Sequence, residues 1–278
     1  MAHLEVRAAN AADYDDYCRL LPELRTGDPV PTREAREARI APETMVLEAD
    51  GAVIASGWVR VLRTWAHVVH VIVDPAWQGR GIGRRLMDAL ADRLRGAGCT
   101  HWYLNVKRDN VAALRLYASA GFAGNVETAV LRIPWSILPS LPTAADAPPP
   151  ATIAPDEDDG CEAQFGLAPG SIQAARARGD LPFRLGDPAR AFAVFNPSFP
   201  GAWCFRAAEP ALVRPLLDAL RPHAPAAVPH VMAVTEDPGV AEALVAGGAE
   251  LRMELYRLSG PIPGAPPRAQ AGAEGERT

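Results

Sequence analysis

The segment HVIVDPAWQGRGIGRR, residues His70–Arg85, decides the fold because it runs from a strand through a glycine-rich turn into a helix. Gly79, Gly81 and Gly83 allow the chain to turn tightly and leave no Cβ in front of the backbone amides. Amides at the N-terminus of a helix point outward with the positive end of the helix dipole, and they suit phosphate oxygens. The segment therefore predicts a site for a pyrophosphate-bearing ligand. The alternative is a flexible connection that only precedes a helix.

Two familiar phosphate-binding motifs do not fit this turn. A Walker loop requires Gly-Lys followed by Ser or Thr, and the single lysine, Lys107, lies elsewhere. A dinucleotide-binding fingerprint requires G-x-G-x-x-G and, about 20 residues later, an acidic residue at the end of a strand. This turn reads G-x-G-x-G, and the next expected strand, residues 102–106, has no acidic residue. The turn therefore belongs to neither class of nucleotide-binding protein.

The residues around the turn predict a domain that mixes strands and helices. Apolar and β-branched runs indicate strands at residues 4–7, 45–49, 53–61, 67–73, 102–106 and 126–133. Helical periodicity indicates helices at residues 11–21, 33–39, 84–95 and 111–120. Asp50-Gly51 joins two of the strands as a β-hairpin turn. This order lacks the strict strand–helix alternation of a doubly wound fold, and it predicts an α+β fold with a mixed sheet.

Composition excludes several classes of protein. Of 278 residues, 49% are apolar and 22% charged, and no apolar run approaches the roughly 20 residues of a membrane span. The first residues carry no secretory h-region, so we expect a cytoplasmic protein. The net charge of −5 without a basic tract argues against nucleic-acid binding. No metal site is expected, because the cysteines lie far apart and form no C-x-x-C pair: Cys18, Cys99, Cys161 and Cys204.

Two motifs together carry a resemblance to a known family. The first is Gln78-x-x-Gly81-x-Gly83, and the second is Asn110-x-x-Ala113-Leu114-x-x-Tyr117-x-x-x-Gly121-Phe122. Over about residues 4–133 the sequence resembles the GNAT superfamily of acyl-CoA N-acyltransferases. The resemblance implies an α+β, three-layer fold with a mixed, mostly antiparallel sheet flanked by helices. It also implies acetyl-CoA as the acyl donor and an amine as the acceptor.

The resemblance assigns the donor site residue by residue. The turn that binds the pyrophosphate comprises Gln78, Gly79, Arg80, Gly81, Ile82, Gly83 and Arg84. The backbone of Val71, Ile72 and Val73 would pair with the pantetheine arm as an added strand does, and an amide of this strand would face the thioester oxygen. Asn110 would hold the pantetheine or cysteamine portion, and Asn105 ends the neighbouring strand close by.

The resemblance places Tyr117 at the position of the general acid that protonates the departing thiolate. An aromatic residue that only packs on the apolar face of its helix is the alternative. His67 is the candidate general base, and His70, a water molecule or no role for either histidine are the alternatives. On a regular strand the three-residue spacing of His67 and His70 would put them on opposite faces, so only one would face the cleft.

The acceptor pocket in this family is usually built from the N-terminal helices and the hairpin. Acidic residues are frequent in this region: Asp15, Asp16, Glu23, Asp28, Glu34 and Glu37. Because Arg25, Arg33, Arg36 and Arg39 lie among them, an ordinary solvated face is favoured over a site for a cationic amine. Trp58 and Trp65 either line the pocket or pack the hairpin.

The second half of the chain resembles a weakened copy of the first. The segment GRRLMDAL, Gly83–Leu90, aligns with VRPLLDAL, Val213–Leu220. Asn105–Phe122 aligns in the same way with Met232–Ala249. The alternative is a chance similarity between amphipathic helices, because the identities are few.

The copy lacks the chemistry of the first half. Where the glycine turn would recur, it has AEPALV, Ala208–Val213, in which no glycine exposes an amide and Glu209 would repel phosphate. Leu244 stands opposite Tyr117. We therefore expect a smaller, degenerate GNAT-like domain that binds no CoA.

These observations predict the domain plan and the activity. The expected plan is a catalytic domain at 1–137, a proline-rich acidic linker at 138–160, the degenerate domain at 161–258 and a disordered tail at 259–278. The expected activity is acetyl transfer from acetyl-CoA to a primary amine of a small molecule or peptide, by direct attack in a ternary complex. The alternatives are a noncatalytic acyl-CoA-binding regulatory module and a protein N-terminal or lysine acetyltransferase. The oligomeric state is expected to be a monomer or homodimer.

Overall fold

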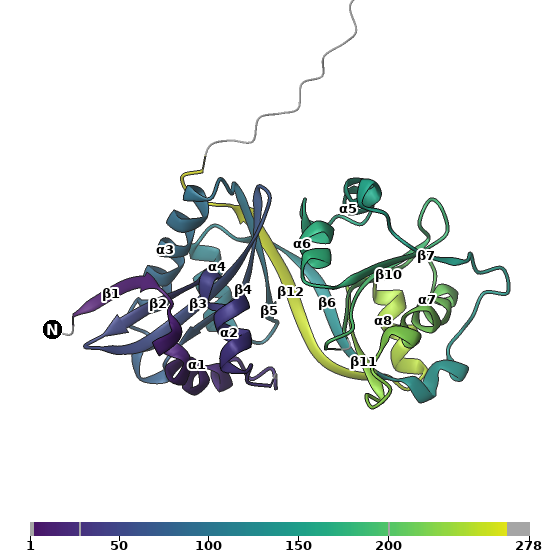
Figure 1. Ribbon diagram of the computed structural model, residues 1–278, viewed down its shortest axis with the longest axis horizontal. Helices are drawn as coiled ribbons and strands as arrows, with labels where there is room; N and C mark the ends of the chain where they lie inside the picture. The colour runs from purple at the N-terminus through teal and green to yellow at the C-terminus, as the bar shows by residue number, and fades with distance from the viewer. Residues whose placement is uncertain (1–2, 28, 200, 266–278) are drawn as a thin grey trace, which may run out of the picture. The chain divides into compact units, whose positions relative to one another are not determined.

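The computed structural model of the chain describes residues 3–27, 29–199 and 201–265 (Figure 1). The chain forms two compact units that interleave along the sequence. Unit 1 consists of residues 1–104, 115–123 and 259–278, and unit 2 consists of residues 105–114 and 124–258. Within the described part of the chain, no helix combines the length and the apolar composition that a membrane span needs.

Unit 1 contains a five-stranded sheet in the order β1-β2-β3-β4-β5. Its strands are β1 (Leu4–Ala8), β2 (Thr44–Ala49), β3 (Ala52–Leu62), β4 (Trp65–Val73) and β5 (His101–Lys107), the last of which passes into unit 2 after residue 104. The pairs from β1 to β4 are antiparallel, and β4 and β5 are parallel. This mixed, mostly antiparallel sheet agrees with the expected α+β class.

Helices cover both faces of this sheet. They are α1 (Tyr14–Leu20), α2 (Arg33–Arg39), α3 (Ile82–Gly96) and α4 (Val111–Ser119), with the short 3-10 helices η1 (Ala11–Asp13), η2 (Leu21–Leu24), η3 (Ala41–Glu43) and η4 (Pro75–Trp77). Consecutive residues of a strand point to opposite faces. A Cβ on Gly57 would meet Leu86 and Leu90 of α3, whereas Trp58 packs in the apolar cluster of Tyr17 of α1. The sheet therefore lies between α3 and α1.

The helix that follows the glycine turn buries one apolar stripe. In α3 the buried residues are Ile82, Leu86, Met87, Leu90, Ala91 and Leu94, which recur at the spacing of one helix face. The helix begins two residues before the predicted range of 84–95, and its first residue, Ile82, is already buried. Burial of this stripe against the sheet fixes the direction in which the helix N-terminus points.

Unit 2 contains a sheet in the order β12-β6-β11-β10-β9-β8-β7. Its strands are β6 (Ala123–Pro134), β7 (Pro150–Thr152), β8 (Leu181–Leu185), β9 (Ala191–Asn196), β10 (Gly201–Ala207), β11 (His230–Thr235) and β12 (Glu250–Pro261). Its helices are α5 (Asp158–Gln164), α6 (Ser171–Ala177), α7 (Val213–Leu220) and α8 (Pro238–Ala246), with η5 (Trp135–Ser140), η6 (Pro155–Glu157), η7 (Pro210–Leu212) and η8 (Arg221–His223).

The structure repeats the architecture of unit 1 in unit 2. In both units, a strand pairs in parallel with the strand that follows the next helix: β4 with β5, and β10 with β11. Both β4 and β10 carry one extra residue relative to the preceding strand. The helices α4 and α8 are each followed by a glycine with positive φ, Gly121 at 89° and Gly248 at 106°. The similarity of the two halves therefore extends beyond a pair of amphipathic helices.

The compact units do not follow the expected boundary at residue 137. The closing strand of the first half, β6, pairs along six residues with β11, so its contacts lie in unit 2. The expected linker, 138–160, contains β7 and η6, and it buries Leu138 and Leu141 in the core of unit 2. Its prolines fit this structure, because Pro150 begins a strand at the edge of the sheet.

The expected disordered tail, 259–278, begins later than the sequence suggests. Residues 259–261 end β12, and Ile262 is buried and donates its N–H to the carbonyl oxygen of Thr100, 2.8 Å away. The remainder of that prediction, residues 266–278, lies outside the described residues.

Gly260, near the end of β12, lies so close to the backbone of Gly121, which follows α4, that no side chain fits at position 260. A Cβ on Gly260 would overlap the carbonyl oxygen of Gly121, and backbone atoms cannot move aside as a flexible side chain can. We predict that Gly260→Ala lowers the free energy of unfolding by about 1–3 kcal/mol, as overpacking does. Denaturant unfolding measures this change. Gly96→Ala is the control, since no atom lies within 4 Å of its Cβ position, and equal loss in both variants would contradict the prediction.

Candidate active site

The glycine turn forms an open cradle of backbone amides. Gly79 and Gly81 have φ angles of 74° and 77°, a left-handed conformation that side chains disfavour. No atom lies within 4 Å of the Cβ position of either residue, so the space in front of the turn is open. The helix α3 starts at Ile82, and the first four N–H groups of a helix have no intrahelical acceptor. An anion such as a pyrophosphate group fits this arrangement of donors.

Side chains at the end of β4 hold the turn in place. Gln78 donates from Nε2 to the carbonyl oxygen of Val73 at 3.1 Å. Asp74 accepts the N–H of Ala76 at 2.9 Å and forms an ion pair with Arg19 of α1. The turn is thus tied both to the strand that precedes it and to the helix α1. Arg80, whose guanidinium lies 5.3 Å from the ring of Trp77, and Arg84 are both exposed and can reach a bound anion.

The edge of β4 next to the turn has little pairing on one side. Parallel pairing with β5 consists of Trp65↔His101, Ala66↔Trp102 and His67↔Tyr103. Among the described residues of unit 1, Val71–Val73 pair with β3 alone. Their outer backbone groups can therefore receive an extended ligand as an added strand. The turn and this edge together fit the pyrophosphate and the pantetheine arm of acetyl-CoA.

The expected opposite orientation of the two histidines of β4 is wrong. Trp58 pairs with His70 and Arg60 pairs with His67, so only one residue separates the partners on β3 while two separate the histidines on β4. The extra residue is Val69, which forms a β-bulge. Because paired residues share a face, the bulge places His67 and His70 on the same face of the sheet.

The two histidines nevertheless have different environments. His70 is 8% exposed and lies between Tyr17 and Trp58, with ring centroids 5.8 Å and 5.6 Å away. Burial, and to a lesser extent the charge of Arg60, lower the pKa of His70 to about 3. His70 is therefore a neutral imidazole at neutral pH. His67 is half-buried, so water and ligands have better access to it.

Tyr117 lies on α4, which packs beside the start of α3. Leu116 Cδ2 is 3.1 Å from the Cβ position of Gly83, and Val73 of β4 is also next to Gly83. The residue before Tyr117 thus contacts the glycine turn and the end of β4. Tyr117 is 8% exposed, and its ring meets that of Phe122 edge to face at 5.8 Å. Burial raises the pKa of Tyr117 to about 12, so the phenol stays protonated.

Asn105 of β5 and Asn110, which begins the second motif, both belong to unit 2, and both are exposed. Asn110 accepts the N–H of Ala113 at 3.1 Å through Oδ1, which is the contact of a helix N-cap. The residue therefore has a structural role at the start of α4. Asn105 lies on an exposed position of β5.

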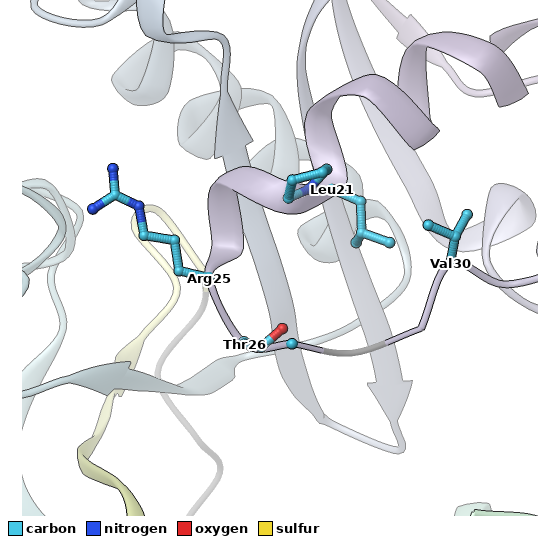
Figure 2. Close-up of a pocket in the computed structure, with 6 residues that line it drawn as sticks. Leu21, Arg25, Thr26 and Val30 are labelled. Atoms are coloured by element: carbon cyan, nitrogen blue, oxygen red, sulfur yellow. The ribbon is translucent and has the colours of Figure 1, made fainter.

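The segment between α1 and α2 forms a shallow hollow on unit 1. In Figure 2, Leu21 and Val30 lie on either side of it, and the side chain of Arg25 extends away. Its volume is about 370 Å³, and its lining comprises Leu21, Pro22, Arg25, Thr26, Gly27 and Val30. The helix η2, which carries Leu21, packs against β4. The hollow therefore lies near the strand that carries both histidines.

Two acidic residues of this region are engaged in ion pairs. Asp15 pairs with Arg33 at 3.2 Å, and Asp16 pairs with Arg19 at 3.0 Å. These exposed pairs agree with an ordinary solvated face. Among the described residues, no cluster of His, Cys, Asp and Glu has the arrangement of a metal site.

Two aromatic residues near the histidines were not identified from the sequence. Tyr17 packs against His70, and Tyr103 stacks on His67 with ring centroids 4.5 Å apart. Neither belongs to a recognisable motif. The contact of Tyr103 depends on the register between β4 and β5, which no local pattern specifies.

In unit 2, side chains fill the place that corresponds to the donor site. The N–H of Ala207, at the end of β10, donates to Oδ2 of Asp237 at 3.2 Å. Glu236 forms ion pairs with Arg206 and Arg257, both at 2.6 Å. The backbone edge that would receive a pantetheine arm thus already has a carboxylate partner.

The counterpart of the glycine turn in unit 2, Ala208–Val213, contains no glycine. It forms η7, which begins with Pro210, and Glu209 pairs with Arg190. Leu244, at the position of Tyr117, is fully buried in the apolar core.

Comparisons with known proteins agree with this geometry. Residues 12–122 match the model of the acetyltransferase (GNAT) family. The chain is 37% identical over 124 residues to the N-alpha-acetyltransferase RimI of Mycobacterium tuberculosis. This match covers 42% of this chain and 77% of that protein. It is 41% identical over 76 residues to the mycothiol acetyltransferase of Beutenbergia cavernae, but this match covers only 27% of this chain and 26% of the relative.

The fold of the whole chain also has a solved counterpart. The GCN5-related N-acetyltransferase of Sphaerobacter thermophilus covers 93% of this chain and 96% of its own, with a TM-score of 0.62 and 17% identity. This similarity extends the fold over both units. Together with the relative that is matched over most of its length, it shows that the chain belongs to the GNAT family of acetyltransferases, which use acetyl-CoA as the acetyl donor.

Proposed function

We propose that this protein transfers the acetyl group of acetyl-CoA to a primary amine by direct attack in a ternary complex. The observation that carries the proposal is the open amide cradle at Gly79 and Gly81, which directly follows the unpaired edge of β4. This arrangement would hold the donor in an extended conformation along the strand. Holding both reactants in place removes much of the entropic barrier to their reaction.

The residues Gln78–Arg84 would hold the pyrophosphate, and the backbone of Val71–Val73 would hold the pantetheine arm. The bulge at Val69 supports a third contact, because a bulged residue lies outside the ladder with the neighbouring strand. An amide there is available to stabilise the oxyanion of the thioester carbonyl. Asn105 and Asn110 remain candidates for contact with the pantetheine or cysteamine portion.

The reaction requires two proton transfers. A C–N bond forms between the amine and the acetyl carbon, the C–S bond breaks, the amine loses a proton and the thiolate gains one. His67 is the proposed general base, because it is half-buried whereas His70 is enclosed by Tyr17 and Trp58. Tyr117 is the proposed general acid, since its buried phenol remains protonated and has no hydrogen bond among the described residues.

We further propose that unit 2 is a degenerate copy that does not bind CoA and that serves the first site structurally. The carboxylate of Asp237 on the edge of β10 and the missing glycines support this role. A noncatalytic acyl-CoA-binding module is the rival function, and loss of turnover without loss of donor binding in the variants below would count against it.

A narrower acceptor, the α-amine at the N-terminus of a protein, has one specific observation in its favour. The match to the N-alpha-acetyltransferase RimI covers 77% of that protein, which is more than the mycothiol acetyltransferase match covers. The hollow lined by Leu21 and Val30 could receive a side chain next to the amine. A panel of peptide N-termini, lysine analogues, polyamines and small amines, scored by release of CoA thiol, tests the acceptor class.

The first prediction for this site concerns the two proposed proton-transfer residues. With a working acceptor, Tyr117→Phe and His67→Ala each lower kcat by about 10²–10⁴-fold, the usual contribution of general acid–base catalysis. The affinity for CoA, measured by calorimetry, stays within about twofold, since neither side chain is assigned to the pyrophosphate. Unchanged thiol release in a variant would remove the role proposed for that residue.

The pH dependence provides a second prediction. The phenol of Tyr117 loses its proton only as the pH rises through about 12, so the acid form is complete below pH 10. We expect that Tyr117 causes no decrease of kcat between pH 8 and 10. We also expect that His70 causes no decrease of kcat as the pH falls from 8 to 5, because its pKa is about 3. A basic limb below pH 10 that Tyr117→Phe abolishes would contradict this assignment.

The third prediction concerns the number of donor sites in the full chain. Calorimetric titration should give one CoA per chain, and Gly81→Asp should abolish binding by blocking the cradle and adding a negative charge. Gly160→Asp is the matched control, because Gly160 has open space around its Cβ position and lies in unit 2. Residual binding of one CoA in Gly81→Asp would place a second site in unit 2.

A further inference from the structure

We propose that Tyr103 is the positioning residue for His67: its ring fixes the plane of the imidazole at the point where β4 and β5 stop pairing. The inference rests on the acetyl transfer and on the role of His67 proposed above. It adds Tyr103 of β5, a residue that belongs to neither sequence motif.

The register between β4 and β5 brings the two rings together. His67↔Tyr103 is the last of the three parallel pairs, so the two side chains stand next to each other on one face of the sheet. Their centroids are 4.5 Å apart and their planes are parallel, with an angle of 0°. Such a stack is attractive beyond simple burial. It therefore favours one orientation of the His67 ring.

This stack occupies one face of the imidazole and does not involve its edge. Both ring nitrogens of histidine lie in the ring plane, so proton transfer takes place at the edge. With the ring plane fixed, the nitrogens move only within that plane. A general base has to lie within hydrogen-bond distance of the group from which it takes the proton. Fixing the ring plane of His67 helps to meet this requirement.

A second pair of rings stacks one position earlier along the same face of β4 and β5. Trp65 and His101 are paired two residues earlier on the same face, and their rings stack with centroids 4.9 Å apart at 19°. His101 is in turn within 3.0 Å of the hydroxyl of Thr100 through Nδ1. Two successive stacks therefore form a row of four rings along β4 and β5, and His67 lies at its open end.

The charged and titratable groups on this face come from all three strands. Arg60 of β3 pairs with His67 across the sheet, and its guanidinium lies 4.4 Å from the ring of Trp58. His70 follows on β4 and is neutral, and Tyr103 and His101 contribute from β5. These strand positions carry no carboxylate on this face. Ring stacking is an orienting contact that the strands supply to His67.

The test compares Tyr103→Leu, which removes the stack, with Tyr103→Phe, which keeps it and removes only the hydroxyl. We expect Tyr103→Leu to lower kcat by about tenfold with an unchanged KM for acetyl-CoA, because a misplaced base slows the proton transfer. Tyr103→Phe should stay within about twofold of the wild-type protein. In the His67→Gln background, the change from Tyr103 to Leu should have no further effect on kcat.

A readout without catalysis separates this inference from the proposed function. In proton NMR, the ring current of Tyr103 should displace the Cε1–H resonance of His67 in the wild-type protein and in Tyr103→Phe, but not in Tyr103→Leu. An unmoved resonance in Tyr103→Leu, an equal kcat loss in Tyr103→Phe, or a further loss in the His67→Gln background each overturns the inference. A wild-type chain that acetylates no amine overturns the proposed function, and the role of Tyr103 with it, even if the stack is seen.

Discussion

The extra residue in β4 is the constraint on which the site depends. Val69 has no partner in β3, and the bulge turns His67 and His70 to the same face. It lies next to the point at which β4 loses its pairing with β5. A regular strand would turn one of the two histidines to the α3 face of the sheet. The bulge thus orients the side chains beside the edge of β4 that β5 leaves unpaired.

Unit 2 has this framework without the glycine turn that we propose as the donor site of unit 1. Strand β10 has its own bulge and its own short parallel pairing, but the glycine turn is replaced by η7. Asp237 accepts the N–H that β10 would offer to a ligand. Both units therefore share features of the fold, and they differ in the few residues at the end of one strand to which we assign donor binding.

Local patterns predicted much of unit 1 and little of the way in which the units are assembled. The glycine turn and α3 were predictable because adjacent residues specify them, and the two motifs identified the family. The shared face of His67 and His70 could not be predicted, since a bulge is visible only in the pairing with β3. The compact units also differ from a boundary at residue 137, because β6 pairs with β11 in unit 2 and no local pattern shows this pairing.

The return of the chain to unit 1 has a consequence for biosynthesis. Ile262 bonds to Thr100, and the backbone carbonyl of Pro263 accepts from Arg95 at the end of α3. A ribosome releases the N-terminus first, yet these contacts become available only after more than 250 residues have been translated. Within this sequence, unit 1 begins to form before unit 2 and is completed after it. A nascent chain therefore carries its glycine turn on an unfinished unit until Ile262 and Pro263 have been translated.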